Sequence, residues 1–144
     1  MSEVDLSNRA IFPVWSQTTV RYSDLDPNSH VNNGAIGAFF EDGRVRLRSE
    51  HLDQSDGGTL AGFAIAKTTI EYRRALGFPA TVDIGSTIAR LGRSSYTLGQ
   101  AVFHGDICVA TAEVVTVRID GESGRSIPIE PEFRAILEKL GPKA

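Results

Sequence analysis

The sequence predicts an α+β fold in which one five-stranded, mostly antiparallel sheet wraps around a long central helix. Three observations predict it: the chain has the length of one domain, a long helical pattern follows the first strand-like run, and four further strand-like runs follow the helix. Its 144 residues can bury a sizeable core but are too few for two ordinary domains. We expect one domain over residues 1–144, with a core at about 14–120 and a short helix at about 131–140.

Composition and charge exclude several classes of function. Hydrophobic residues make up 41% of the chain and charged residues 23%, as in ordinary globular proteins. The net charge is only −3 and like charges form no block, so we expect binding to neither nucleic acid nor anionic lipid. No stretch approaches the roughly 20 apolar residues that span a membrane. With one cysteine, Cys108, and no apolar secretory signal at the start, we expect a cytoplasmic protein.

The first strand-like run covers residues 14–22, where β-branched and aromatic side chains favour a pleated surface. A polar turn follows it, because proline fixes φ and short polar side chains bond to nearby backbone. The turn contains Asp24, Asp26, Pro27, Asn28 and Ser29. It should end any continuing strand.

A helix is predicted after the turn, with Asn32 or Asn33 as its N-cap. Its apolar positions, with one glycine among them, follow the spacing of a single helical face. They are Ile36, Phe39, Phe40, Gly43 and Leu47. Asp42 and Arg46 stand four apart, which supports an exposed face opposite. Because three glycines weaken the helix, tight packing must hold it.

Polar and glycine residues at 53–59 predict a loop that borders a pocket, and the remaining strands follow at 63–72, 81–91, 94–103 and 107–119. Gly92-Arg93 and His104-Gly105-Asp106 separate the last three runs as short turns, which predicts an antiparallel meander. The final run is apolar on both faces, so it should lie inside the sheet.

The candidate chemistry lies where the turn meets the helix. Asp26 and His30 stand just before the helix start, where the first backbone N–H groups have no partner within the helix. A carboxylate beside such donors suits attack on a polarised carbonyl. Taken alone, Asp26 is better explained as a turn or cap carboxylate, while His30 is also explained as a backbone-bonded turn residue and Asn33 as a cap. Asp24 should stabilise the turn.

A calcium loop is the other interpretation of this stretch. Asp24, Asp26 and Asn28 imitate the first ligands of an EF-hand. The sixth position, however, is Ser29 rather than glycine, and the twelfth is Ala35, which has no side-chain oxygen. We therefore expect no metal site.

Several segments taken in order resemble a known family. The string RYSDLDPNSHVNN covers residues 21–33, FEDGR follows at 40–44, and YRRALG and GRSSY stand at 72–77 and 92–96. Together they resemble the hotdog-fold acyl-CoA thioesterases of the 4-hydroxybenzoyl-CoA thioesterase type, over most of the chain. The resemblance implies the hotdog fold, which is a five-stranded sheet around one helix.

The resemblance implies an enzyme that hydrolyses an acyl-CoA or acyl carrier protein thioester to a free carboxylic acid and a thiol. Asp26 would be the catalytic carboxylate, as nucleophile or general base, and backbone amides near Asn33 and Gly34 would polarise the carbonyl. His30 completes the candidate catalytic set. No separate cofactor is expected, because the coenzyme A moiety belongs to the substrate.

Phosphates of coenzyme A would need cationic partners, and guanidinium forks match phosphate oxygens. The candidates are Arg73, Arg74, Arg93 and Ser94, with Arg90 beside them, although arginines at strand edges also serve solubility. Ser29 and Ile36 depart from the family pattern, which has glycine and an aromatic residue there. Ile36 should reshape the acyl pocket, and Glu41 gains a functional interpretation only from the resemblance.

Two other functions fit the same fold: a non-catalytic hotdog module that binds acyl thioesters, and a dehydratase, for which no separate acid/base pair is present. A homodimer or homotetramer is also expected. Hotdog subunits pair edge strands and build their sites from two chains, and an unpaired edge strand is otherwise a liability.

Overall fold

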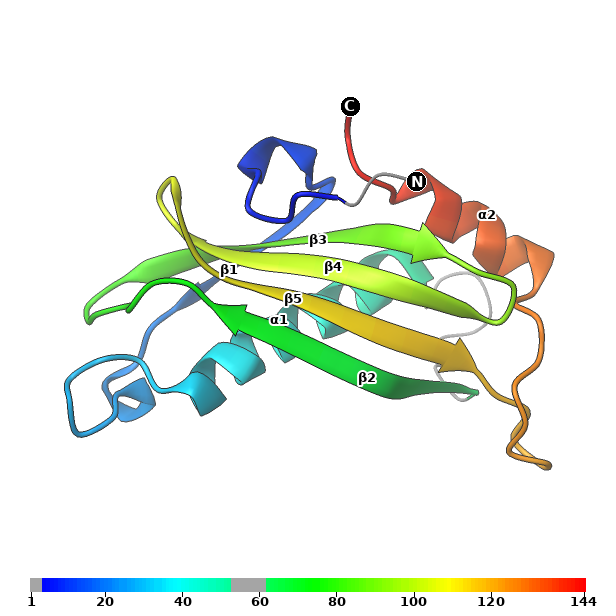
Figure 1. The fold of residues 1–144 in the computed structure, drawn as a ribbon, viewed down its shortest axis with the longest axis horizontal. Coiled ribbons are helices and arrows are strands. Elements are labelled where there is room, and N and C mark those ends of the chain that lie inside the picture. The colour runs from blue at the N-terminus through cyan, green and yellow to red at the C-terminus, as the bar shows by residue number, and fades with distance from the viewer. Residues whose placement is uncertain (1–3, 53–61) are drawn as a thin grey trace.

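The computed structural model describes residues 4–52 and 62–144. Five strands form one antiparallel sheet in the spatial order β1-β3-β4-β5-β2 (Figure 1). They are β1 (Val14–Thr19), β2 (Phe63–Tyr72), β3 (Thr81–Leu91), β4 (Ser95–His104) and β5 (Ile107–Arg118). The meander of the last three strands and the interior place of β5 are confirmed. The loop expected at 53–59 lies outside the described residues.

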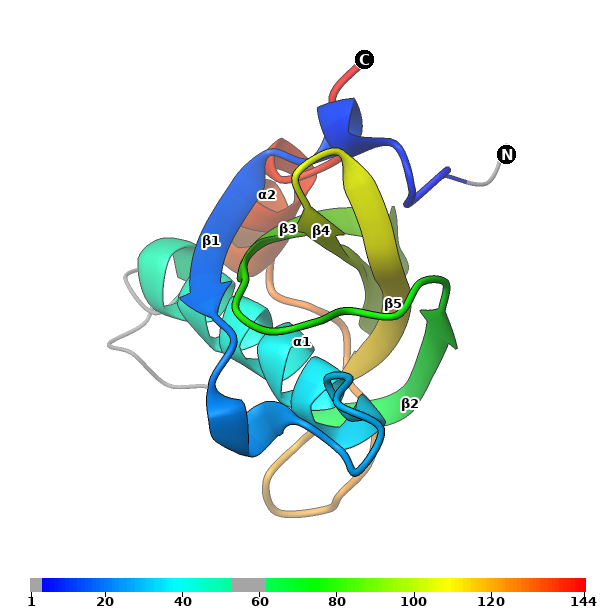
Figure 2. The same ribbon diagram turned by 90° about the vertical axis from the view of Figure 1, so that its left-hand side faces the viewer.

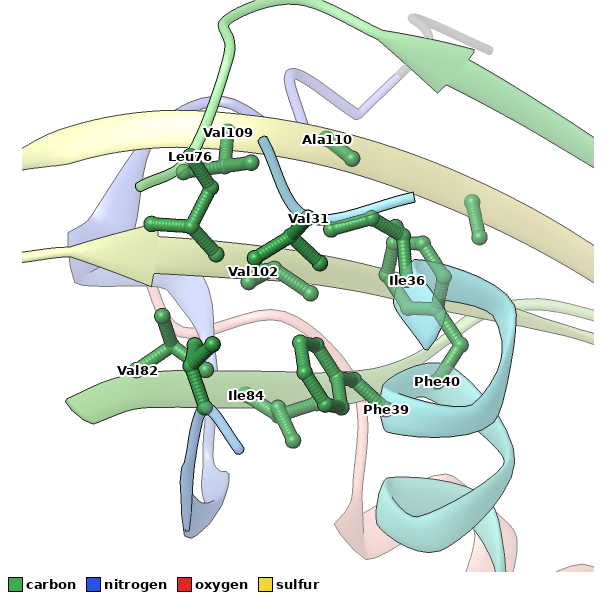
Figure 3. Packing of buried hydrophobic residues seen from close by; sticks show 12 residues of the cluster. Val31, Ile36, Phe39, Phe40, Leu76, Val82, Ile84, Val102, Val109 and Ala110 are labelled. Carbon is green, nitrogen blue, oxygen red and sulfur yellow. The ribbon is translucent and has the colours of Figure 1, made fainter. Parts of the chain in front are cut away.

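The long helix α1 (Asn33–Leu47) lies along the concave side of the curved sheet (Figure 2). It begins after the N-cap Asn32 and continues as a π-helical turn, η3 (Arg48–Leu52). The predicted apolar face is confirmed, since all five of its positions are buried. Ile36, Phe39 and Phe40 pack there against strand residues that include Ile84 and Val102 (Figure 3).

Close approach of α1 to the sheet explains the glycine in its apolar face. A Cβ built on Gly43 would lie 2.7 Å from Cγ2 of Ile84 and 2.9 Å from Nε2 of Gln100. Gln100 is fully buried, and its Nε2 donates to the Phe40 carbonyl at 3.0 Å and to Oγ of Ser86 at 3.1 Å. The helix is therefore fixed to β4 and β3 at its centre.

The remaining elements are short. A 3₁₀ turn, η1 (Arg9–Ile11), precedes β1, and the helix α2 (Pro131–Lys139) ends the chain close to its predicted place. Phe133 and Leu137 of α2 join Leu47 of α1 in a second apolar cluster. No helix in the described part of the chain is long and apolar enough to cross a membrane.

The first strand ends earlier than predicted. β1 stops at Thr19 because Tyr22–Asp24 form a second 3₁₀ turn, η2. The Asp24 side chain, nearly buried, accepts a hydrogen bond from the Arg21 backbone N–H at 2.8 Å and closes that turn. Asp24 thus stabilises the turn, as predicted.

Candidate active site

The turn that carries Asp26 is closed by short-range hydrogen bonds. The Asp26 N–H donates to the His30 carbonyl at 2.7 Å, and the Ser29 N–H donates to the Asp26 carbonyl at 3.0 Å. Oδ1 of Asp26 accepts from the N–H groups of Asn28 at 2.8 Å and His30 at 3.2 Å. One carboxylate oxygen is therefore anchored, and within the described residues Oδ2 accepts no hydrogen bond.

The turn is tied to its surroundings at both ends. Leu25 and Val31 form an isolated β-bridge, and the Val31 N–H donates to the Leu76 carbonyl at 2.8 Å. The Asn32 N–H donates to the Asp24 carbonyl at 2.9 Å. These bonds hold Asp26 between the start of α1 and the connection from β2 to β3.

The start of α1 offers free donors beside this carboxylate. Oδ1 of Asn32 accepts from the Ala35 N–H at 2.8 Å, which confirms one of the two predicted caps. The N–H groups of Asn33 and Gly34 have no acceptor in the part of the chain that the structure describes. Together with the helix dipole, they give this end of α1 a partial positive charge. The arrangement can stabilise a developing oxyanion.

Asp26, His30 and Asn33 meet at a cavity of about 320 Å³. Its apolar wall comes from the turn, the first turn of α1, the loop after β2 and the start of β5 (Figure 3). The wall residues are Val31, Ile36, Leu76 and Val109. A cavity with one apolar wall beside a carboxylate and free amides suits an acyl group with a reactive carbonyl.

Two of the predicted phosphate-binding residues lie at the same cavity. Arg73 and Arg74 follow β2 and line the cavity beside Tyr72. Their backbone N–H groups both donate to the Val109 carbonyl, at 2.8 and 3.1 Å, which fixes this segment against β5. Both side chains are exposed, so their guanidinium groups can meet an anion at the cavity mouth.

The structure does not bring the other predicted pair there within one chain. Arg93 and Ser94 lie in the turn between β3 and β4, at the opposite end of the sheet (Figure 1). A strand as long as β3 rises roughly 35 Å. The carbonyls of Arg93 and Ser94 accept from the N–H groups of Ile129 and Arg118, so this turn is anchored far from Asp26.

Sequence reasoning missed part of the cavity. Tyr72, Leu76 and Val109 line it, and only Val109 carried a signal, through the alternation of apolar residues along its predicted strand. Gly34, a predicted site residue, does not line the cavity. Glu41 lies at a separate hollow on α1, beside Arg21 and Val45.

Other reactive groups do not join the site. Burial raises the pKa of the Cys108 thiol, which is half-buried. In residues 4–52 and 62–144, no group of three or more histidine, cysteine, aspartate or glutamate side chains could hold a metal ion.

Known proteins resemble this chain over most of its length. A family model described as the thioesterase-like superfamily matches residues 20–137. The long-chain acyl-CoA thioesterase FadM of Escherichia coli K12 is 29% identical over 133 residues, which cover 87% of this chain and 97% of FadM.

Solved structures agree. A thioesterase from Thermus thermophilus, complexed with coenzyme A and Zn, is 28% identical with a TM-score of 0.77, over 90% of this chain and 94% of that one. The PA5185 protein of Pseudomonas aeruginosa PAO1 is 26% identical with a TM-score of 0.79, over 94% of this chain and 96% of that one. The predicted hotdog fold is confirmed.

Proposed function

The chain belongs to the thioesterase-like superfamily, and we propose that it hydrolyses acyl-CoA thioesters to a carboxylic acid and coenzyme A, with Asp26 as the catalytic carboxylate. The family match and the likeness to FadM confirm the predicted enzyme class, a thioester hydrolase. One observation carries the residue assignment: Asp26 and the first residue of α1, Asn33, meet at a single cavity with an apolar wall.

The division of roles follows from the hydrogen bonds of Asp26. Oδ1 accepts hydrogen bonds from two backbone N–H groups, which keep the carboxylate in place, so Oδ2 is the oxygen that reacts. The thioester oxygen would bind the N–H groups of Asn33 and Gly34. A single oxyanion donor contributes about 3–4 kcal/mol of barrier reduction, so two such donors are a main source of rate.

Two routes balance from this geometry. In the first, Oδ2 attacks the thioester carbon, the C–S bond breaks, the thiolate takes a proton, and water hydrolyses the resulting mixed anhydride. In the second, Oδ2 takes a proton from water, the hydroxide attacks the carbon, and the departing thiolate receives that proton. His30, exposed at the cavity mouth, would orient the water or the thioester.

The substrate assignment rests on charge and on the wall of the cavity. Arg73 and Arg74 at the mouth would bind phosphates of coenzyme A, and the apolar wall with Ile36 would hold the acyl group. FadM acts on long-chain acyl-CoA, and the Thermus thermophilus relative binds coenzyme A. We therefore favour coenzyme A over a carrier protein as the thiol.

The decisive experiment replaces Asp26 with Asn, which keeps Oδ1 as an acceptor for the turn. Free-thiol release is measured on aliphatic and aromatic acyl-CoAs and on matching acyl carrier proteins. We expect Asp26→Asn to lower kcat by about a hundredfold or more, while Asp42→Asn on the exposed face of α1 keeps it. Wild-type turnover by Asp26→Asn would disprove the role. Saturable binding without thiol release by the wild type would instead indicate an acyl-binding module.

We also propose a homodimer, or a tetramer built from it, through the edge strand β2. Nearly the whole of β2 is exposed. It starts at Phe63, at the end of the sheet that carries Arg93, and ends at Tyr72 beside the cavity. Antiparallel pairing of β2 with its copy would bring Arg93 and Ser94 of the partner subunit toward Asp26.

A kinetic test follows for this shared site. Arg93→Ala should raise KM for acyl-CoA and leave kcat nearly unchanged, because phosphate binding is remote from the reacting carbon. Light scattering at micromolar concentration should show dimers or tetramers. Monomers alone, or an unchanged KM for Arg93→Ala, would contradict the shared site.

A further inference from the structure

A second cavity lies on the outer face of the sheet, and we call it the outer groove. Its volume is about 530 Å³, larger than the cavity at Asp26. Strands β2 and β5 form its floor, and the N-terminal segment at residues 4–7 forms one wall. That segment lies across the sheet from α1 (Figure 2). Of the predicted site residues only Arg73 lines the outer groove, so the proposed hydrolysis leaves this cavity without a role.

The floor of the outer groove alternates hydroxyl and carboxylate side chains. Thr69 of β2 faces Glu113 of β5, and Glu71 faces Thr111. Ile70, between the two β2 residues, packs against the core, so its neighbours in the strand point outward. The two glutamates are therefore diagonal neighbours on one face of the sheet, about 7–8 Å apart.

The polar groups of the floor are free to bind a ligand. Glu71 and Glu113 are exposed, and neither carboxylate forms an ion pair or a hydrogen bond within the described part of the chain. Thr111 is only 7% exposed, and its outward hydroxyl has no hydrogen-bond partner among those residues. A nearly buried hydroxyl without a partner, beside two unpaired carboxylates, indicates a site for a positively charged donor.

The wall of the outer groove is fixed against the sheet. Leu6 packs so closely on β4 that a Cβ built on Gly99 would lie 2.6 Å from its Cδ2. Oδ1 of Asp5 accepts hydrogen bonds from the N–H of Ser7 at 3.0 Å and from its Oγ at 2.6 Å. Asp5 thereby holds a third carboxylate at the groove. The groove is formed before any ligand binds.

The charges and their spacing select the ligand. Three carboxylates and the guanidinium of Arg73 leave the groove negative, so it attracts a cation. Within the described residues, no three acidic, histidine or cysteine side chains could hold a metal ion. Two ammonium groups joined by four methylene groups lie about 6 Å apart, because an extended chain advances about 3.8 Å over three bonds. That separation suits carboxylates on diagonal neighbours, and the ammonium groups can also donate to the hydroxyl of Thr111.

Arg73 joins the outer groove to the candidate active site, because it lines both cavities. Its backbone N–H is fixed to the Val109 carbonyl, while its side chain is exposed. Hydrogen bonds from Ser7 lower the pKa of Asp5, and the charge of Arg73 lowers it further. The guanidinium is therefore attracted by the groove as well as by an anion at the cavity mouth.

We propose that the outer groove binds a linear aliphatic diamine, with its ammonium groups on Glu71 and Glu113, and that the bound cation turns Arg73 toward the cavity at Asp26. The second part rests on the proposed function, in which Arg73 binds a phosphate of coenzyme A. A cation in the groove repels the guanidinium and takes its place beside the carboxylates. Diamine and acyl-CoA therefore bind with positive coupling, and each tightens the binding of the other by the same factor.

The first test measures binding of butane-1,4-diamine to the full chain by calorimetry. Glu71→Gln with Glu113→Gln should raise Kd about tenfold or more, because two charged contacts are lost. Both side chains are exposed, so the variant should keep the urea midpoint of the wild type. Glu138→Gln, at an exposed position of α2, should leave Kd unchanged. Butan-1-amine, with one charge, should bind more weakly than the diamine. Absence of diamine binding, or equal affinity in the double variant, would overturn the proposal.

The second test measures the coupling by thiol release. Saturating diamine should lower KM for acyl-CoA about fivefold and leave kcat unchanged. Acyl-pantetheine, which lacks the phosphates, should not respond, and Arg73→Ala should bind the diamine without a fall in KM. Sodium chloride at equal ionic strength controls for screening. An unchanged KM in the wild type, or a fall that persists in the double glutamine variant, would overturn the coupling. Failure of the proposed function would abolish thiol release but not the calorimetric binding.

Discussion

The turn at residues 25–32 and the centre of α1 are held by opposite means. Hydrogen bonds between residues two to four apart close the turn around Asp26, and its tip at residues 27–30 stays exposed. The centre of α1 is buried, and Gly43 and the Phe40 carbonyl lie against Ile84 and Gln100, which are 40 to 60 positions away in the chain. Local chemistry therefore shapes the carboxylate turn, while long-range packing fixes the helix whose amides face it.

The largest effect on stability is expected at the buried centre of α1, from Gly43→Ala. The new methyl group would overlap Ile84 and Gln100, and this overlap should cost about 1–3 kcal/mol of stability. The higher helix propensity of alanine would offset up to about 1 kcal/mol of that cost. We expect a net loss of about 2 kcal/mol in the free energy of unfolding, measured by urea denaturation. Ile84→Ala should recover part of that loss in a double-mutant cycle. Strict additivity would show that Ile84 does not limit the space at Gly43.

A smaller effect is expected where the two regions join, from Asn32→Ala. Losing the 2.8 Å bond to the Ala35 N–H should cost about 1 kcal/mol of stability. It should also lower kcat, because the first-turn amides lose their support. Asn32→Ser keeps a capping oxygen and should retain most of the stability and most of kcat. Urea denaturation measures the first and thiol release the second. Equal kcat values for the alanine and serine variants would show that the cap does not contribute to catalysis.

The smallest effect is expected in the turn itself, from Ser29→Gly. Ser29 has φ of 64°, in the left-handed region that favours glycine. Relief of strain should exceed the added entropy of the unfolded chain and stabilise the protein by about 0.5 kcal/mol. The urea midpoint should rise for Ser29→Gly and not for Ser29→Ala. A lower midpoint for the glycine variant would mean that the serine side chain contributes more than its strain costs.

Much of the fold was predictable because its signals are periodic. The ranges of β2 and β3 agree with the predicted strands, and the apolar face of α1 is buried at every predicted position. The early end of β1 was not predictable, because the bond between Asp24 and Arg21 competes with the strand. The site divides in the same way: Asp26, His30 and Asn33 are close in sequence and meet at one cavity, whereas Arg93 is adjacent to it in neither sequence nor space.

The sequence by itself determined the α+β class, the polar turn, the helix cap and the string that resembles a thioesterase family, because each depends on residues a few positions apart. Only the tertiary structure decided which apolar residues wall the cavity, why Gly43 must be glycine, and that the phosphate-binding candidates fall at two ends of the sheet. Those relations depend on strand register and helix packing, which join residues that no local pattern connects.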